Sequence, residues 1–332
     1  MRVIAVEEHF AAPGIAKATS SGEWATRMRE LGDRGLRLGT GVLDRLTDLA
    51  EGRLAAMDQS GIDLQVLSQT QPGAEVLPPR EAIPLAREAN DLLAEAISRH
   101  PDRFSGFAVL PTQAPDAAAQ ELERAVTKLG LKGALINGRA GGRFLDDPAF
   151  LPIFESAERL GVPIYLHPGL PPEPVRDANY GGLSPAVGHW LSIAAWGWHV
   201  DTGLHALRLI AAGVFDRHPR LQVVLGHMGE AIPFMLERTS MTLARQVTGL
   251  DREVKDYFTQ NFYATTSGLF SYPPLLCLLL VLGADRVMFA VDYPYSSNQE
   301  GRAFLDSLPL SDADKEKIAH SNAERLLGLP PS

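Results

Sequence analysis

Val3-Ile4-Ala5-Val6-Glu7-Glu8-His9 is the first apolar run of the sequence, a predicted strand that ends in carboxylates and an imidazole. Side chains two positions apart on a strand point to the same side, so Glu7 and His9 are directed at one point. Three later apolar runs end in polar residues of the same kinds, His167, His227 and Asp292. Imidazole and carboxylate together suit a divalent transition metal. The pattern therefore predicts a metal site where several strand ends meet.

Strand-like and helix-like segments alternate along the whole chain. The predicted strands are 3–6, 64–68, 105–110, 133–137, 163–167, 222–226, 262–266 and 287–291. Amphipathic stretches that predict helices are 47–60, 81–100, 114–129, 148–160, 202–212, 231–247, 273–282 and 311–327. The strands are apolar along most of their length, which is typical of a parallel sheet covered on both faces.

This alternation predicts an α/β fold, a (β/α)₈ TIM-like barrel that occupies residues 1–332 as a single domain. An open doubly wound sheet is the alternative. The barrel is favoured because its active-site residues come from the C-terminal ends of several strands and converge on one axis. Long connections at 10–46 and 168–201 follow the first and fifth strands, and they contain all four tryptophans. These tryptophans are expected either to cover the barrel or form a subunit contact, or to stack on a substrate.

Composition excludes several classes of partner. The net charge is −9 with no Lys/Arg cluster, which argues against binding to nucleic acid. No apolar run reaches the roughly 20 residues that span a membrane. The only cysteine is Cys277, so no intrachain disulfide is possible. The N-terminus lacks the features of a signal peptide, and a cytoplasmic location is expected.

The surroundings of the candidate ligands add detail. Glu230 begins the helical segment after His227 and is placed to hydrogen-bond its ring and fix the tautomer. Asp292 follows an apolar strand, so its protonation is open to tuning by a dry environment. The oxygen and nitrogen ligands admit either Zn²⁺ or Mn²⁺.

Several motifs together resemble the amidohydrolase superfamily. They are Glu7-Glu8-His9-Phe10, Gly61-Ile62-Asp63-Leu64, Lys132-Gly133-Ala134-Leu135, Tyr165-Leu166-His167-Pro168-Gly169, Gly226-His227-Met228-Gly229-Glu230 and Val291-Asp292-Tyr293-Pro294-Tyr295. Within that superfamily the chain is similar to the decarboxylase branch, which includes aminocarboxymuconate semialdehyde decarboxylase and the hydroxybenzoate decarboxylases of the γ-resorcylate (2,6-dihydroxybenzoate) type. The likeness covers nearly the whole chain.

The resemblance implies a role for each matching position. The implied metal ligands are Glu7, His9, His167 and Asp292, with His227 beside the metal and Glu230 as its partner. Binuclear relatives carry a bridging Lys or Glu after the fourth strand, where this chain has Asn137. A mononuclear site without an organic cofactor is therefore implied, and so is a homodimer or homotetramer.

The expected reaction is nonoxidative decarboxylation of a small ortho-hydroxylated aromatic acid, with release of CO₂ and with carboxylation as its reverse. A proton must be delivered to the ring carbon that bears the carboxylate. Resemblance and geometry favour Asp292 as the donor, and His227 is the alternative. The rival functions are a lactonase-like metal-dependent hydrolase, in which His227 would activate a water, and a noncatalytic barrel that binds a small acid.

Candidate substrate contacts lie near strand ends or in the long connections: Phe10, Asn137, Tyr180, Trp196, His199, Arg238 and Tyr295. Arg238 would meet a substrate carboxylate, although an arginine on a helix after the sixth strand has an equally good structural explanation.

Overall fold

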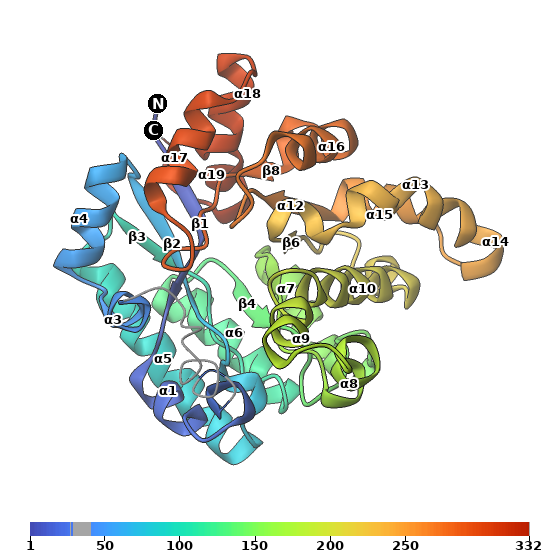
Figure 1. Ribbon diagram of the computed structural model, residues 1–332, viewed down its shortest axis with the longest axis horizontal. Coiled ribbons are helices and arrows are strands. Elements are labelled where there is room, and N and C mark those ends of the chain that lie inside the picture. The colour runs from blue at the N-terminus through green and yellow to red at the C-terminus, as the bar shows by residue number, and fades with distance from the viewer. Residues whose placement is uncertain (27, 29–40, 332) are drawn as a thin grey trace.

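Eight parallel strands form a ring in the computed structural model, which describes residues 1–332 except 27, 29–40 and 332 (Figure 1). The strands are β1 (Ile4–Phe10), β2 (Leu64–Gln69), β3 (Phe104–Gly106), β4 (Ala134–Asn137), β5 (Ile164–His167), β6 (Val223–Leu225), β7 (Phe262–Thr265) and β8 (Val287–Met288). All eight lie within or overlap the predicted strands.

The ring is closed by backbone hydrogen bonds at two seams. Strands β1 to β3 form one set and β4 to β8 another, each in sequence order. At the first seam Ala108 N donates to Gly133 O at 2.8 Å, and at the second His9 N donates to Tyr293 O at 2.7 Å. A single parallel bridge lies at each seam. The fold is therefore the predicted barrel, and the open doubly wound sheet is excluded.

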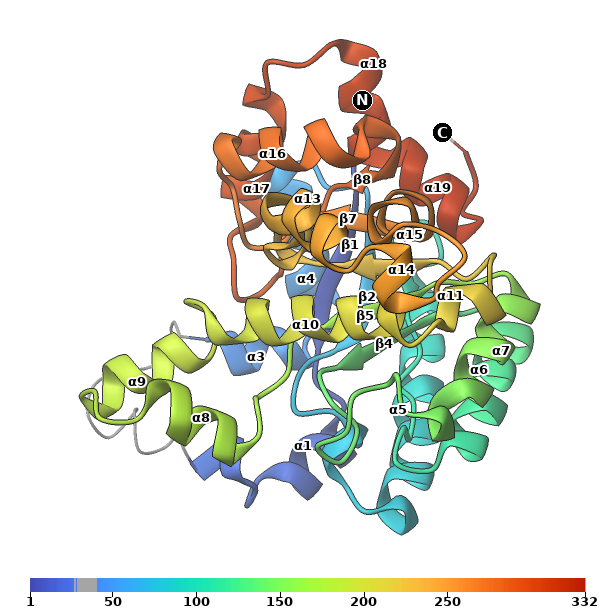
Figure 2. The same cartoon turned by 90° about the vertical axis from the view of Figure 1, so that its right-hand side faces the viewer.

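Helices surround the ring and cover its outer face (Figure 1 and Figure 2). The helices of eight or more residues are α4 (Glu51–Ser60), α5 (Pro79–Arg99), α6 (Pro115–Leu129), α7 (Leu151–Leu160), α8 (Glu173–Tyr180), α9 (Pro185–Ser192), α10 (Gly197–Ala211), α13 (Ile232–Thr242), α15 (Val254–Asn261), α16 (Tyr272–Leu282) and α17 (Asn298–Ser307). The shorter ones are α1 (Pro13–Thr19), α3 (Val42–Thr47), α11 (Val214–Arg217), α12 (His227–Glu230), α14 (Arg245–Thr248), α18 (Asp312–Glu316), α19 (Asn322–Leu327), the 3₁₀ turns η1 (Ala74–Val76), η2 (Pro148–Phe150) and η3 (Ala284–Arg286), and a π-helical turn, η4 (Lys317–Ser321). None of the described helices is both long enough and apolar enough to cross a membrane.

A bulge in β1 decides which side chains face the barrel axis. Ile4 and Val6 belong to an apolar cluster contributed by all the strands, which fills the lower interior of the barrel. Ala5 pairs with Gln65 and Glu8 with Leu67, so β1 takes three steps where β2 takes two. The extra residue reverses the alternation of side chains. Glu7 and His9 can therefore face the interior above Val6.

The structure also corrects several predicted boundaries. The stretch 47–60 is divided into α3 and α4, because the Asp48 carboxylate accepts a hydrogen bond from Ala50 N at 2.8 Å in a local turn. Helix α10 begins at Gly197 rather than at 202, so part of the predicted loop is its first turn. The long connection at 168–201 contains α8 and α9. The connection at 10–46 contains α1, and its residues 27 and 29–40 lie outside the described part.

Candidate metal centre and active site

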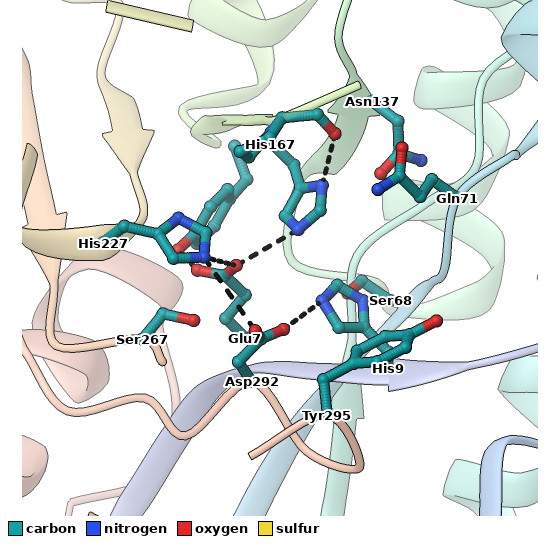
Figure 3. Close-up of polar contacts among 12 residues, drawn as sticks. Glu7, His9, Ser68, Gln71, Asn137, His167, His227, Ser267, Asp292 and Tyr295 are labelled. Atoms are coloured by element: carbon teal, nitrogen blue, oxygen red, sulfur yellow. Dashed lines mark hydrogen bonds and ion pairs between the residues drawn. The ribbon is translucent and has the colours of Figure 1, made fainter. Parts of the chain in front are cut away.

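Four predicted ligands converge at the mouth of the barrel. Glu7 and His9 come from β1, His167 from the end of β5, and Asp292 from the segment after β8 (Figure 3). One ligand atom from each lies within 4.8 Å of the others. His9 Nε2 is 3.1 Å from Asp292 Oδ1, and His167 Nε2 is 3.2 Å from Glu7 Oε1. Residues 285 positions apart in the chain thus share one point, because the C-terminal ends of parallel strands meet there.

Two atoms of this cluster are buried without a hydrogen-bond partner. They are Glu7 Oε1 and His9 Nε2, in side chains that are 0% and 1% exposed. Buried polar atoms are nearly always satisfied, and each exception needs an explanation. A cation between two imidazole nitrogens and two carboxylate oxygens would satisfy both atoms, and this donor set suits a first-row divalent metal. The residues present therefore fit a metal ion.

Neighbouring side chains orient the inner ligands. The Tyr165 hydroxyl donates to Glu7 Oε2, and Thr265 Oγ1 lies 3.4 Å from the same oxygen, which leaves Oε1 directed into the site. Ser68 Oγ is 3.3 Å from His9 Nδ1. His167 Nδ1 donates to Pro168 O at 2.8 Å. Such contacts fix the tautomer and the ring orientation, so that each Nε2 is left for the ion.

The backbone around Asp292 is shaped for the site. Asp292 has a φ of 70°, in the left-handed region that L-residues rarely adopt, and its N–H donates to Glu7 O at 3.0 Å. Gly268, with a φ of 59°, passes so close that a Cβ there would lie 3.2 Å from Asp292 Oδ2. The short loop after β7 therefore requires glycine at this point, both for its conformation and for its proximity to the carboxylate.

His227 stands beside the ligand cluster and is tied to Glu230. Its Nε2 lies 3.9 Å from both Glu7 Oε1 and Asp292 Oδ2, while its Nδ1 donates to Glu230 Oε1 at 2.8 Å. The other oxygen of Glu230 accepts from His199 Nδ1 at 2.7 Å. The hydrogen bond predicted between His227 and Glu230 is present, and the carboxylate links two histidines rather than one.

These carboxylates determine which groups hold protons. Burial by itself would lower the pKa of His227, but the charges of Glu230 and Glu7 raise it well above its usual value. Burial would raise the pKa of Glu230, yet the charges of His227 and His199 bring it down to about 2. For Asp292, burial is outweighed by the neighbouring imidazoles of His227 and His9, and its pKa falls below its usual range. The imidazole of His227 is thus the more basic group beside the ligands.

A cavity of about 1060 Å³ opens over the cluster. Its floor contains His9, His167, His227 and Asp292, and most of its walls are apolar. All four tryptophans line it: Trp24, Trp190, Trp196 and Trp198. The rings of Trp24 and Trp198 lie 5.8 Å apart with a tilt of 33°. A cavity of this size, apolar apart from a few convergent polar groups, is suited to a small aromatic ligand.

The predicted substrate contacts do not all reach this cavity. Trp196, His199 and Tyr295 line it, whereas Asn137 lines a neighbouring cavity of about 510 Å³ that shares Trp24 and Gln71 with the first. Phe10 is adjacent to His9 and therefore packs on the opposite side, in the outer apolar layer. Arg238 is exposed on α13, and Tyr180 is buried at the end of α8; neither lines the two cavities described.

Some residues of the site were missed from the sequence. Tyr165 carried a signal, since it lies two positions before His167 on a predicted strand and must share its face. Ser68 ends a predicted strand, as the ligands do. Gly268 and Thr265 gave no signal, because their importance comes from contacts with residues that are distant in the chain.

Comparison with known proteins gives a consistent result. The family model described as amidohydrolase matches residues 9–329. A γ-resorcylate decarboxylase of Rhodococcus jostii (strain RHA1) is 42% identical, with 98% of each chain covered. The structure of a 2,6-dihydroxybenzoate decarboxylase complexed with 2,6-dihydroxybenzoate has a TM-score of 0.87 at 37% identity, covering 99% of both chains. A dihydroxybenzoic acid decarboxylase from Polaromonas sp. JS666, with manganese and the inhibitor 2-nitroresorcinol bound, has a TM-score of 0.88 at 35% identity, covering 100% of this chain and 98% of the other.

Proposed function

The chain belongs to the amidohydrolase family, and from this we propose that it is a metal-dependent decarboxylase that removes CO₂ from an ortho-hydroxylated benzoic acid of the 2,6-dihydroxybenzoate type. The observation that carries the proposal is the conjunction of the buried, unsatisfied ligand pair Glu7 Oε1 and His9 Nε2 with an apolar cavity directly above it. We also propose that residues 1–332 act as one domain.

A single divalent ion is proposed to lie between Glu7, His9, His167 and Asp292, and manganese is our preference over zinc. The bound manganese in the Polaromonas enzyme supports this choice. Asn137, the neutral side chain at the end of β4, offers neither the carboxylate nor the amine with which a second ion would be bridged. When bound, the ion would supply positive charge to hold the substrate's carboxylate and its neighbouring hydroxyl oxygen.

The protein's own groups deliver the proton. We assign His227 as the group that holds the proton, because Glu230 and Glu7 raise its pKa, and Asp292 as the group that passes it to the ring carbon bearing the carboxylate. Breaking the bond to the carboxylate carbon then restores the aromatic ring and releases CO₂. His199, Trp196 and Tyr295 are proposed substrate contacts. The hydroxyl of Tyr295 shares a 2.6 Å hydrogen bond with that of Thr70, and we propose that this pair contacts a substituent on the substrate ring.

The rival function is lactonase-like hydrolysis on the same barrel, and the relatives favour decarboxylation. A test follows absorbance changes of a panel of hydroxybenzoates and of lactones with the Mn²⁺-loaded protein. We expect loss of 2,6-dihydroxybenzoate with formation of resorcinol and CO₂, and no lactone hydrolysis. Turnover of a lactone with every hydroxybenzoate unchanged would overturn the proposal.

A homo-oligomer, dimeric or tetrameric, is also proposed. Phe234 on α13 and Leu280 on α16 both line the cavity and are 82% and 81% exposed, and contiguous exposed apolar surface is typical of protein interaction sites. Light scattering during size-exclusion chromatography would measure the assembly, and a monomer would contradict it. A cytoplasmic location remains a prediction.

A further inference from the structure

Glu8 is the middle residue of the first motif, and the metal site does not use it. It is 0% exposed and does not belong to the cluster of ligand atoms formed by its neighbours Glu7 and His9. Its side chain points away from that cluster because adjacent residues on a strand face opposite sides. A fully buried carboxylate normally has hydrogen-bond donors that compensate for its removal from water. The identity of those donors indicates what Glu8 does.

Both oxygens of Glu8 accept backbone hydrogen bonds from the segment that carries Asp292. Oε1 accepts from Val291 N at 2.9 Å, and Oε2 accepts from Tyr293 N at 3.1 Å. These two N–H groups flank Asp292 on either side. The carboxylate therefore holds the two peptide groups between which Asp292 is fixed.

Asp292 needs such a restraint. Its φ of 70° is in the left-handed region, which is unfavourable for a non-glycine residue. Strand β8 ends at Met288, so the regular ladder of strand hydrogen bonds does not extend to this point. The Asp292 N–H is bound to Glu7 O at 3.0 Å, and His9 N donates to Tyr293 O at 2.7 Å. Together with the two bonds to Glu8, these bonds fasten three consecutive residues to the end of β1.

A buried arginine supports the same arrangement. Arg53 is fully buried, donates to His9 O at 2.6 Å, and stands over the Tyr293 ring at 5.0 Å. Burial raises the pKa of Glu8 well above its usual value, and the two backbone hydrogen bonds and the charge of Arg53 oppose that rise. Through its contacts with His9 and Tyr293, Arg53 joins the end of β1 to the segment after β8, although neither Arg53 nor Glu8 lines the cavity.

We propose that Glu8 is a positioning residue for the decarboxylation: by holding the Val291 and Tyr293 N–H groups it fixes the Asp292 carboxylate between His9 and His227. This inference rests on the proposed function where turnover is concerned, but the positioning of Asp292 as a ligand is testable without a substrate. The competing explanation is that Glu8 only holds the seam of the barrel closed.

The test compares Glu8→Gln with a matched control, Thr266→Val. Thr266 Oγ1 makes an equivalent side-chain clamp on the same segment, donating to Ala290 O at 2.9 Å and accepting from Ala290 N at 3.0 Å, but it does not flank Asp292. Both variants are expected to lower the unfolding temperature. Only Glu8→Gln, which replaces one accepting oxygen by an NH₂ group, is expected to weaken Mn²⁺ binding to the apo protein and to lower kcat, each by about 10–100-fold.

A double-mutant cycle identifies the route of the effect. Mn²⁺ affinity is measured by electron paramagnetic resonance titration for wild type, Glu8→Gln, Asp292→Asn and the double variant. If Glu8 acts through Asp292, the loss caused by Glu8→Gln disappears in the Asp292→Asn background. An equal loss in both backgrounds, or a Glu8→Gln protein that changes only in unfolding temperature as Thr266→Val does, would overturn the proposal.

Two further measurements cover the cases in which a variant does not fold or the wild type is inactive. If Glu8→Gln does not fold, Glu8→Asp replaces it, since this variant keeps the carboxyl group while its shorter side chain cannot reach both N–H groups. Wild-type Mn²⁺ affinity and kcat in that variant would refute the inference. If the wild type binds Mn²⁺ but leaves 2,6-dihydroxybenzoate unchanged, the proposed function fails and the Mn²⁺ cycle still decides the role of Glu8.

Discussion

The lower interior of the barrel and its mouth are built from the same strands but bury different atoms. Below, Ile4, Val6 and their counterparts on the other strands form an apolar plug that Ala323, Leu327 and Leu329 extend at the C-terminus. Above, the same strands end in carboxylates and imidazoles, two of whose atoms have no hydrogen-bond partner. The plug is stabilised by apolar packing alone, whereas the two unsatisfied atoms at the mouth need a bound metal ion. Substitutions in the two regions should therefore separate stability from function.

The largest separation is expected for His167→Ala. Removing one of two imidazole ligands should abolish Mn²⁺ retention and take decarboxylation below detection. The apo protein should stay folded, with its unfolding temperature lowered by the loss of the 3.2 Å contact between His167 Nε2 and Glu7 Oε1. Metal analysis after desalting and calorimetry of the apo proteins measure both. A variant that keeps its Mn²⁺ would remove His167 from the ligand set.

Next in size is the contrast between Asp292→Asn and His227→Asn. Losing a positioned acid typically costs 10²–10⁴-fold in rate. The rate of Asp292→Asn should fall by a factor within this range. The rate of His227→Asn should fall less, since Asp292 can still receive a proton from solvent. Deuterium incorporation into resorcinol formed in D₂O reports the transfer, with bound Mn²⁺ measured in each variant. An inert His227→Asn beside an active Asp292→Asn would make His227 the donor.

In the apolar plug, Leu327→Ala should cost about 2–5 kcal/mol of unfolding free energy, the usual cost of a buried leucine. Mn²⁺ affinity should stay at the wild-type value. Leu43→Ala is the matched control, because Leu43 is 77% exposed and its truncation leaves no cavity. Denaturant unfolding and a Mn²⁺ titration of both variants check the prediction. Weakened Mn²⁺ binding in Leu327→Ala would show that the two regions are coupled.

Tyr165 belongs to both regions, since its ring packs in the plug and its hydroxyl donates to Glu7. Tyr165→Phe retains the ring and removes the hydroxyl, with its hydrogen bonds to Glu7 and to Thr265 Oγ1 at 3.0 Å. Mn²⁺ affinity should fall by about 10–100-fold, as for other partners of metal ligands. The free energy of unfolding should fall less in Tyr165→Phe than in Leu327→Ala. A large loss of stability with unchanged Mn²⁺ affinity would show that the tyrosine contributes through packing instead.

The smallest expected effect concerns a histidine outside both regions. Burial lowers the pKa of His205 from 6.5 to about 3, and its Nε2 accepts from Leu145 N at 2.8 Å. The native ring stays neutral while the unfolded one takes up a proton below pH 6.5, so stability falls as the pH drops. The loss attributable to His205 is about 1.4 kcal/mol at pH 5.5. His205→Gln should show a flatter dependence in denaturant melts from pH 7.5 to 5.5, and parallel curves would contradict this.

Much of the architecture was predictable because polar residues directly after apolar runs mark the strand ends in the sequence. Glu7, His167 and Asp292 each follow an apolar run, and the barrel brings such positions together by its topology. The division of the stretch 47–60 was not predictable from periodicity, since a turn of three residues at Asp48 leaves the apolar pattern almost intact.

The side-chain contacts were harder to predict than the strand ends. Phe10 lies in the outer apolar layer, as strand alternation from His9 requires, and the exposed position of Arg238 depends on how α13 packs. Glu8 could not be placed from sequence at all, since its partners at Val291 and Tyr293 are more than 280 positions away. The roles of the ligands and substrate contacts stay predictions until the variants are measured.

The bulge in β1 makes the chemistry of this protein depend on a residue count as well as on residue identities. Deleting Val6 would restore regular pairing with β2 and move Glu7 into the inward place that Val6 now occupies, one step below the other ligands. Every side chain needed for the site would still be encoded, yet the site would be lost. Among descendants of this chain, substitutions around the motif can therefore accumulate one at a time, whereas a change of length here removes the function in a single event.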